Sequence, residues 1–172
     1  MERKLELCDI AGYLPYGLYV DANLLSGKYC NKVLGLYESE LFVKYSHTHI
    51  CLFLNTVKPI LYPIDSLYGP ITHNGKEIVP IVELAKIVRP NYDWKLSKDN
   101  ICYACGEKPN FFIIFYYQDN AFEVYNTRGI KSIYGNQYQL FDYLHELKID
   151  YRRLIDAGLA IDCNTLDINP YK

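Results

Sequence analysis

Short hydrophobic runs separated by turn residues dominate the first half of the chain. Glycine and proline recur at close intervals up to Pro70 and bound brief β-branched or aromatic runs. This spacing is typical of short antiparallel strands. We therefore expect strands near residues 18–21, 28–37 and 41–54, with a break near Ser46 that turns the last of them into a hairpin.

Two local signals mark the middle of the chain. The Asn74-Gly75 pair favours the positive backbone angles of a tight turn, so residues 72–77 predict a hairpin. Pro80 suits the first turn of a helix, because its missing N–H is not needed there. We expect this helix to run to about Val88, whereas residues 89–109 carry no pattern that favours helix or strand.

The second half changes from a strand pattern to a helix pattern. Strands are expected over residues 111–117, 121–126 and 130–134, and the short polar turns between them indicate a meander. Hydrophobic residues then recur at three- and four-residue spacing, as in an amphipathic helix. The residues of this stripe are Leu140, Phe141, Leu144, Leu147, Tyr151, Leu154 and Ile155. Gly158 is placed to cap the end of that helix.

These elements together predict the α+β class. We expect short antiparallel strands, arranged as a meander and hairpins, packed with one long C-terminal amphipathic helix and a shorter middle helix. The sequence has no linker, internal repeat or low-complexity segment. It therefore predicts a single compact domain over residues 1–172.

Composition narrows the class of protein. Half of the 172 residues are hydrophobic, 22% are charged and the net charge is −2, as in globular proteins. Basic residues form no stripe, so duplex nucleic acid is not an expected partner. The N-terminus lacks the apolar run of a signal peptide, and no apolar stretch approaches the roughly 20 residues of a membrane-spanning helix. We expect a cytoplasmic protein with no membrane contact.

Cysteine and histidine supply the candidate metal ligands. Cys102 and Cys105 have the spacing with which two thiolates bind one zinc ion, or with which a thioredoxin-like redox pair forms. The remaining zinc ligands would be distant in sequence, most plausibly His47 and His49 or Cys51. The competing interpretation is that the cysteines are plain reduced thiols and the histidines lie in a half-exposed turn. No cofactor is expected on balance. The isolated cysteines Cys8, Cys30, Cys51 and Cys163 are expected to be reduced and mostly buried.

Tyrosine is the compositional feature that bears on binding. The chain has 18 tyrosines, whose rings are apolar and whose hydroxyls form hydrogen bonds, a combination that suits interfaces. They also suit strands. If Phe122 points to the core, strand alternation turns Tyr125 outward together with either Tyr116 or Tyr117. These three tyrosines are the candidate binding residues.

Several segments resemble a family of small uncharacterised proteins encoded by phages and prophages of gut anaerobic bacteria. The segments are 14–18 (LPYGL), 57–61 (VKPIL), 71–75 (ITHNG), 79–81 (VPI) and 158–162 (GLAID), in this order. Residues 62–67 depart from the family, whose members often have an arginine and then Pro-Leu-Ser-Asp-Leu there. The Cys102 region is not a family feature. The resemblance implies a phage or prophage setting and assigns no function and no site residue.

The sequence therefore supports three functional hypotheses. Phosphate loops, nucleophile elbows and zinc-protease motifs are absent from it, so we expect a non-enzymatic protein-interaction domain that binds a protein partner or forms a homo-oligomer. The alternative is an enzyme with an unrecognised, metal-assisted site. A weaker alternative is single-stranded nucleic-acid binding by stacked tyrosines.

Overall fold

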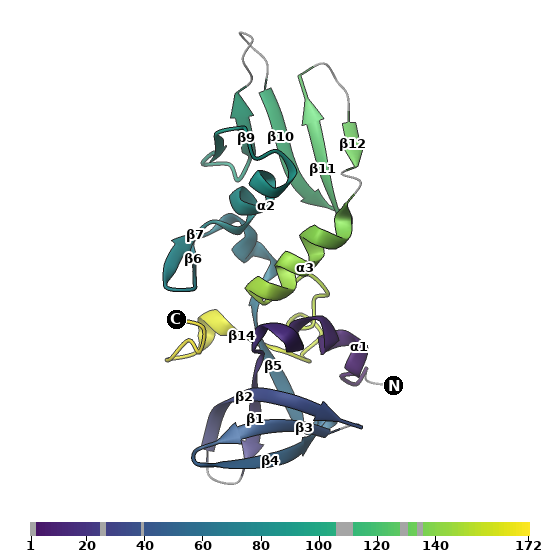
Figure 1. Cartoon of the computed structure of the whole chain (residues 1–172), viewed down its shortest axis with the longest axis vertical. Coiled ribbons are helices and arrows are strands. Elements are labelled where there is room, and N and C mark those ends of the chain that lie inside the picture. Colours follow the sequence, from purple (N-terminus) through teal and green to yellow (C-terminus); the bar gives the residue numbers. More distant parts are fainter. Residues whose placement is uncertain (1–2, 25–26, 39, 106–111, 128–130, 134–135) are drawn as a thin grey trace. The chain divides into compact units, whose positions relative to one another are not determined.

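The chain forms two compact units, shown in the computed structural model of Figure 1. The structure describes residues 3–24, 27–38, 40–105, 112–127, 131–133 and 136–172. Unit 1 comprises Met1–Ile64 and Leu144–Lys172, and unit 2 comprises Asp65–Tyr143. Unit 2 is thus an insertion between two segments of unit 1. The prediction of a single domain over residues 1–172 concerns how the two units associate, and it stays a prediction.

Unit 1 is built on a mixed sheet, which has seven strands within the described residues. The strand order is β13-β5-β1-β2-β3-β4, and β14 also pairs with β5. The bounds are β1 Tyr19–Leu24, β2 Gly27–Tyr37, β3 Glu40–Tyr45, β4 Thr48–Phe53, β5 Val57–Pro63, β13 Ile149–Asp150 and β14 Ile161–Asp162. β13 and β14 run parallel to β5, and the other pairs are antiparallel.

Alternation along the strands builds the core of unit 1. Leu41 and Val43 of β3 are fully buried, whereas Phe42 between them is exposed. Short helices pack at the N-terminus, and the Tyr13 hydroxyl donates a hydrogen bond of 2.8 Å to the carbonyl oxygen of Ile149. The helices that lie wholly in unit 1 are α1 Leu7–Ile10, η1 Ala11–Tyr16, η2 Leu54–Thr56 and η4 Cys163–Thr165.

Unit 2 contains an antiparallel sheet, which has five described strands in the order β12-β11-β10-β9-β8. The bounds are β8 Trp94–Leu96, β9 Cys102–Cys105, β10 Phe112–Gln118, β11 Ala121–Asn126 and β12 Lys131–Ile133. A separate hairpin joins β6 Ile71–His73 to β7 Lys76–Ile78. Helix α2 spans Pro80–Val88. The division between the units falls within η3 Ile64–Tyr68 and within α3 Gln137–Leu147.

Aromatic rings fill the core of unit 2. Helix α2 packs against β8, β9 and β10 (Figure 1). On the covered face of the sheet, Phe115 stacks on Phe122 with ring centroids 5.5 Å apart. Trp94 and Phe141 extend this row, with centroids 6.2 Å from Phe115 and 5.6 Å from Phe122 respectively. One face of the sheet is therefore committed to the core.

The structure confirms most of the strand and turn predictions. The strands expected in the first half correspond to β1 to β4, and Ser46, with φ 52°, lies in the turn between β3 and β4. Asn74 and Gly75 both have positive φ at the tip of the β6–β7 hairpin. The middle helix begins at Pro80 and ends at Val88, as predicted. The meander of β10, β11 and β12 is also confirmed over the described residues. Phe111, Ile130 and Tyr134, at the ends of the predicted strands, lie outside the described residues.

The prediction of a long C-terminal helix was wrong. The stripe leucines are buried, but α3 ends at Leu147 because Lys148 adopts a left-handed conformation with φ 60°. The chain then pairs with β5, where Ile149 lies opposite Tyr62. The Asp150 carboxylate next accepts hydrogen bonds from the backbone N–H groups of Leu154 and Ile155. These tertiary and side-chain partners replace the hydrogen bonds that a longer helix would have formed.

The prediction of a purely antiparallel arrangement was also wrong. β5 carries Pro59 and Pro63, which read as turn residues in the sequence, yet it is the strand with which β1, β13 and β14 all pair. β8 and β9 lie in the stretch that carried no clear pattern. The fold is α+β with mostly strand structure, three short α-helices in the described part of the chain and one mixed sheet.

No helix of the described residues is long and apolar enough to span a membrane.

Candidate functional site

One face of the unit 2 sheet carries several aromatic side chains at its surface. Residues that pair across antiparallel strands point to the same face. Ile114 pairs with both Tyr103 and Tyr125, and Tyr116 pairs with Glu123. By strand alternation Phe112 also joins this face. We define the tyrosine face as Tyr103, Phe112, Ile114, Tyr116, Glu123 and Tyr125.

The tyrosine face is the sheet face opposite to α2, and its rings are partly open to solvent. Phe112 and Tyr125 are 40% and 38% exposed, and the other aromatic rings are half-buried. Glu123 is buried among them. The structure thus places Tyr116 and Tyr125, two of the three candidate binding residues, on one surface.

Tyr117 points the other way. It pairs with Phe122, and its ring centroid lies 4.9 Å from that of Phe122 and 6.4 Å from that of Phe141. It therefore packs within the aromatic core of unit 2. The side chains of the two adjacent tyrosines, Tyr116 and Tyr117, therefore lie on opposite faces of β10.

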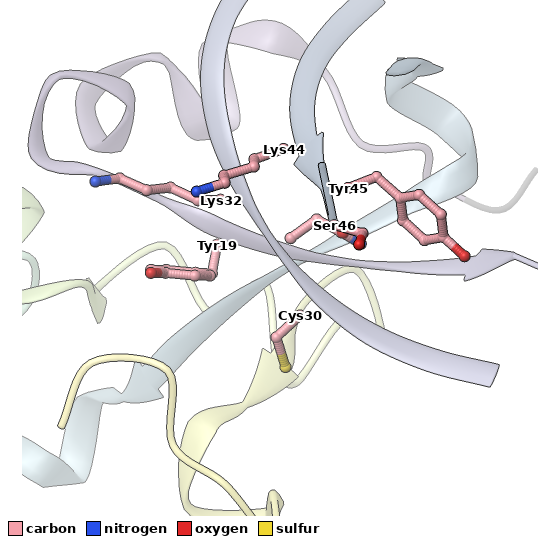
Figure 2. Close-up of a pocket in the computed structure, with 7 residues that line it drawn as sticks. Tyr19, Cys30, Lys32, Lys44, Tyr45 and Ser46 are labelled. Carbon is pink, nitrogen blue, oxygen red and sulfur yellow. The ribbon is translucent and has the colours of Figure 1, made fainter. Parts of the chain in front are cut away.

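Unit 1 contains a pocket of about 640 Å³, within the size range of small-molecule sites. We call it the lysine pocket (Figure 2). Its lining residues are Tyr19, Cys30, Asn31, Lys32, Lys44, Tyr45 and Ser46. Burial, and secondarily the charge of Asp21, raise the pKa of the Cys30 thiol. Cys30 therefore stays protonated near neutral pH, and the pocket offers hydrogen-bond donors and positive charge rather than a thiolate nucleophile.

The two candidate cysteine ligands do not face each other. Cys102 and Cys105 are three residues apart on β9, so their side chains point to opposite faces of the strand. Burial raises the pKa of the Cys102 thiol to about 12, and its sulfur lies 3.8 Å from the carbonyl oxygen of Ile81. His47 and His49 are exposed beside the β3–β4 turn of unit 1, whereas both cysteines belong to unit 2. Zinc binding stays a prediction.

The isolated cysteines differ from the expected burial. Cys163 is buried, but Cys8, Cys30 and Cys51 are exposed. Cys51 lies on β4 opposite Phe42, a neighbour that is itself exposed. The prediction that these four thiols are mostly buried was therefore wrong.

Sequence reasoning missed two features of unit 1. The first is the lysine pocket, which depends on the register between β2 and β3. The second is a set of exposed apolar residues on β2, β3 and β4, namely Leu34, Tyr37, Phe42 and Phe53. Both alternation phases of β3 contain apolar residues, so the pattern alone does not show which face is buried. Both the lysine pocket and the exposed apolar residues can be recognised only once the pairing of the strands is known.

No protein-family model matches this sequence, and neither a curated protein nor a solved structure is significantly similar to it. The resemblance to phage and prophage proteins therefore stays a prediction, and function has to be argued from the geometry.

Proposed function

We propose that the protein is a non-enzymatic protein-interaction domain, encoded by a phage or prophage, whose tyrosine face binds a protein partner in the cytoplasm. The observation that carries the proposal is that the two faces of the unit 2 sheet differ in what covers them. Helix α2 packs on one face, while the other keeps Phe112 and Tyr125 exposed. Exposed aromatic side chains that lie together on one surface are a mark of interaction sites.

The tyrosine face carries charges of both signs, because Lys95 pairs with Tyr103 on the same face as Glu123. Glu123 lies among the rings, with its neighbour Tyr116 paired directly across from it. This mixed charge supports protein binding over the stacking of single-stranded nucleic acid, which needs a positively charged groove.

A double substitution tests the proposal. Tyr116→Ser together with Tyr125→Ser removes two rings from the tyrosine face. We expect the affinity for the partner to fall at least tenfold, which corresponds to about 1.4 kcal/mol, because interface tyrosines are often the energetically dominant contacts. The partner is first recovered from cells and purified, and its direct binding to the purified protein is then measured by calorimetry.

Two single variants serve as controls. Tyr138, on α3, is 89% exposed and lies outside the tyrosine face, so Tyr138→Ser should leave both affinity and thermal midpoint unchanged. Tyr117→Ser should lower the thermal midpoint, since this ring packs on Phe122. If the double variant binds as tightly as the wild type, the tyrosine face is not the interface. If it unfolds, its rings belong to the core and the proposal falls.

A further inference from the structure

The lysine pocket collects positive charge without any carboxylate in its lining. Lys32 comes from β2 and Lys44 from β3, and Figure 2 shows both side chains reaching into the same region as the Tyr19 ring. Tyr19 and Ser46 add hydroxyl groups to the lining, whereas the Tyr45 side chain points away from the two lysines in Figure 2. The lining therefore offers ammonium and hydroxyl donors together.

The strand register brings the two lysines next to each other. Val33 pairs with Val43, and continuing this antiparallel register by one residue sets Lys32 opposite Lys44, both of which line the pocket. Like charges in this arrangement destabilise a sheet. Among the residues that the structure describes, neither lysine forms an ion pair. The acidic side chain nearest to the lining is Asp21, which pairs with Cys30 across β1 and β2.

A third lysine adds to the positive potential behind the pocket. The Nζ of Lys148 lies 5.5 Å from the ring centroid of Tyr171 and 6.0 Å from that of Tyr16, and the Tyr171 ring packs edge-on against Tyr19 of the lining. Burial lowers the pKa of Lys148 to about 8; the Glu146 carboxylate opposes this shift, and the charge of Lys32 adds to it. The two ammonium groups thus influence each other.

The backbone beside the pocket also makes room for Lys32. Gly17 has φ +74°, and a Cβ at this position would lie 3.3 Å from Cε and 3.7 Å from Nζ of Lys32. A side chain there would both strain the backbone and crowd the lysine. Glycine lets the ammonium of Lys32 sit against the main chain.

We propose that the lysine pocket binds the phosphate group of a small phosphorylated molecule. Lysine ammonium groups bind phosphate as compact point charges, and charge-assisted hydrogen bonds to phosphate oxygens are strong. A dianion between Lys32 and Lys44 would be attracted by both ammonium groups. The pocket volume of about 640 Å³ leaves space for more than a phosphate group, and the Tyr19 ring offers a flat surface to an aromatic part of the ligand.

Titration with three probes tests the proposal at constant ionic strength. Inorganic phosphate, adenosine monophosphate and adenosine are each added to the ¹⁵N-labelled protein, and backbone amide shifts are followed. We expect saturable shifts centred on Tyr19, Lys32, Lys44 and Ser46 with both phosphate-bearing probes. Adenosine should bind at least tenfold more weakly than its monophosphate. Equal binding of adenosine and its monophosphate, or no saturable binding of either phosphate-bearing probe, overturns the proposal.

Charge-matched variants separate the pocket from general electrostatics. Lys32→Gln with Lys44→Gln should weaken phosphate binding at least tenfold, whereas Lys32→Arg with Lys44→Arg should retain it. The control removes the same charge at two exposed positions outside the pocket, Lys4→Gln with Lys98→Gln, and should change affinity less than twofold. An equal loss in this control also overturns the proposal.

Thermal unfolding gives a second readout that does not depend on the amide spectra. Without phosphate, the Lys32→Gln, Lys44→Gln variant should be at least as stable as the wild type, because Lys32 no longer disfavours the positive charge of Lys148. Added phosphate should raise the thermal midpoint of the wild type, since a ligand that binds the native state stabilises it. A rise of the same size in this variant contradicts the proposal.

Discussion

Lys148 combines several unusual properties in one residue. It ends α3 in a left-handed conformation, its Nζ donates a hydrogen bond of 2.6 Å to the carbonyl oxygen of Glu146, and its side chain is buried against tyrosine rings. Burial disfavours the charged form of a lysine. The residue therefore titrates closer to neutrality than an exposed lysine does, with the pKa of about 8 given above.

Lys148→Met is expected to reveal this titration as a pH dependence of stability. In the unfolded chain the lysine has its ordinary pKa of 10.5, and in the folded protein about 8. Between these values the unfolded state binds more protons, so the free energy of unfolding of the wild type rises with pH relative to the variant. From pH 7 to pH 9 the gain should be about 1 kcal/mol. Denaturant titrations of both proteins at each pH measure it.

The variant comparison isolates Lys148 from other titrating groups. Cys163 and Tyr171, whose pKa values are raised by burial, titrate in both proteins and cancel in the difference. Glu146 and Lys32 are likewise present in both proteins. A difference that does not change with pH would show that Lys148 keeps its ordinary pKa in the folded protein.

At the scale of elements, the residues of α3 divide sharply between core and solvent. Leu144 is fully buried and Tyr138 is almost fully exposed, although both lie on the same helix. Leu144→Ala should therefore cost about 2–5 kcal/mol, the range for a buried leucine. Tyr138→Ala should cost less than about 0.5 kcal/mol, as surface substitutions do. Denaturant unfolding of both variants tests this contrast, and a cost below about 1 kcal/mol for Leu144→Ala would place the stripe outside the core.

Elements set by local signals could be predicted, and elements set by distant partners could not. The Asn74-Gly75 turn and the helix start at Pro80 need only a few neighbouring residues. By contrast, β13 forms because Ile149 pairs with Tyr62 of β5, which lies far earlier in the chain. The apolar stripe continues beyond β13, so the sequence pattern gives no sign that the helix ends before it. Burial of the stripe leucines and the helix up to Leu147 were predictable from their spacing, whereas the end of the helix at Leu147 was not.

The same distinction applies to the candidate sites. Alternation alone predicts that Tyr125 shares a face with either Tyr116 or Tyr117, and the pairing of Tyr116 with Glu123 identifies which one. The lysine pocket requires Lys32 and Lys44 to meet across two strands, which the bulge near Gly35 makes impossible to count from sequence. The order of charged residues along the chain does not indicate that Lys32 and Lys44 lie on neighbouring strands.

At the scale of the whole molecule, the last residues of the chain hold the first strands together. The Tyr171 hydroxyl accepts a hydrogen bond of 3.1 Å from the backbone N–H of Tyr19 and donates one of 2.7 Å to the carbonyl oxygen of Ile60. Tyr19 belongs to β1 and Ile60 to β5, so this hydroxyl bridges two neighbouring strands. The C-terminal segment thus completes unit 1, although the whole of unit 2 precedes it in the sequence.

Tyr171→Phe tests whether the two units unfold independently. The substitution keeps the ring but leaves a backbone donor and a backbone acceptor without the hydroxyl, which should cost unit 1 about 1–3 kcal/mol. Both hydrogen bonds of this hydroxyl lie within unit 1, and unit 2 has its own aromatic core, so hydrogen exchange should accelerate in β1 and β5 while β10 and β11 keep their wild-type protection. Cooperative unfolding of residues 1–172 as one domain would instead make exchange accelerate equally in all four strands, because the free energy of global opening would then fall for every amide.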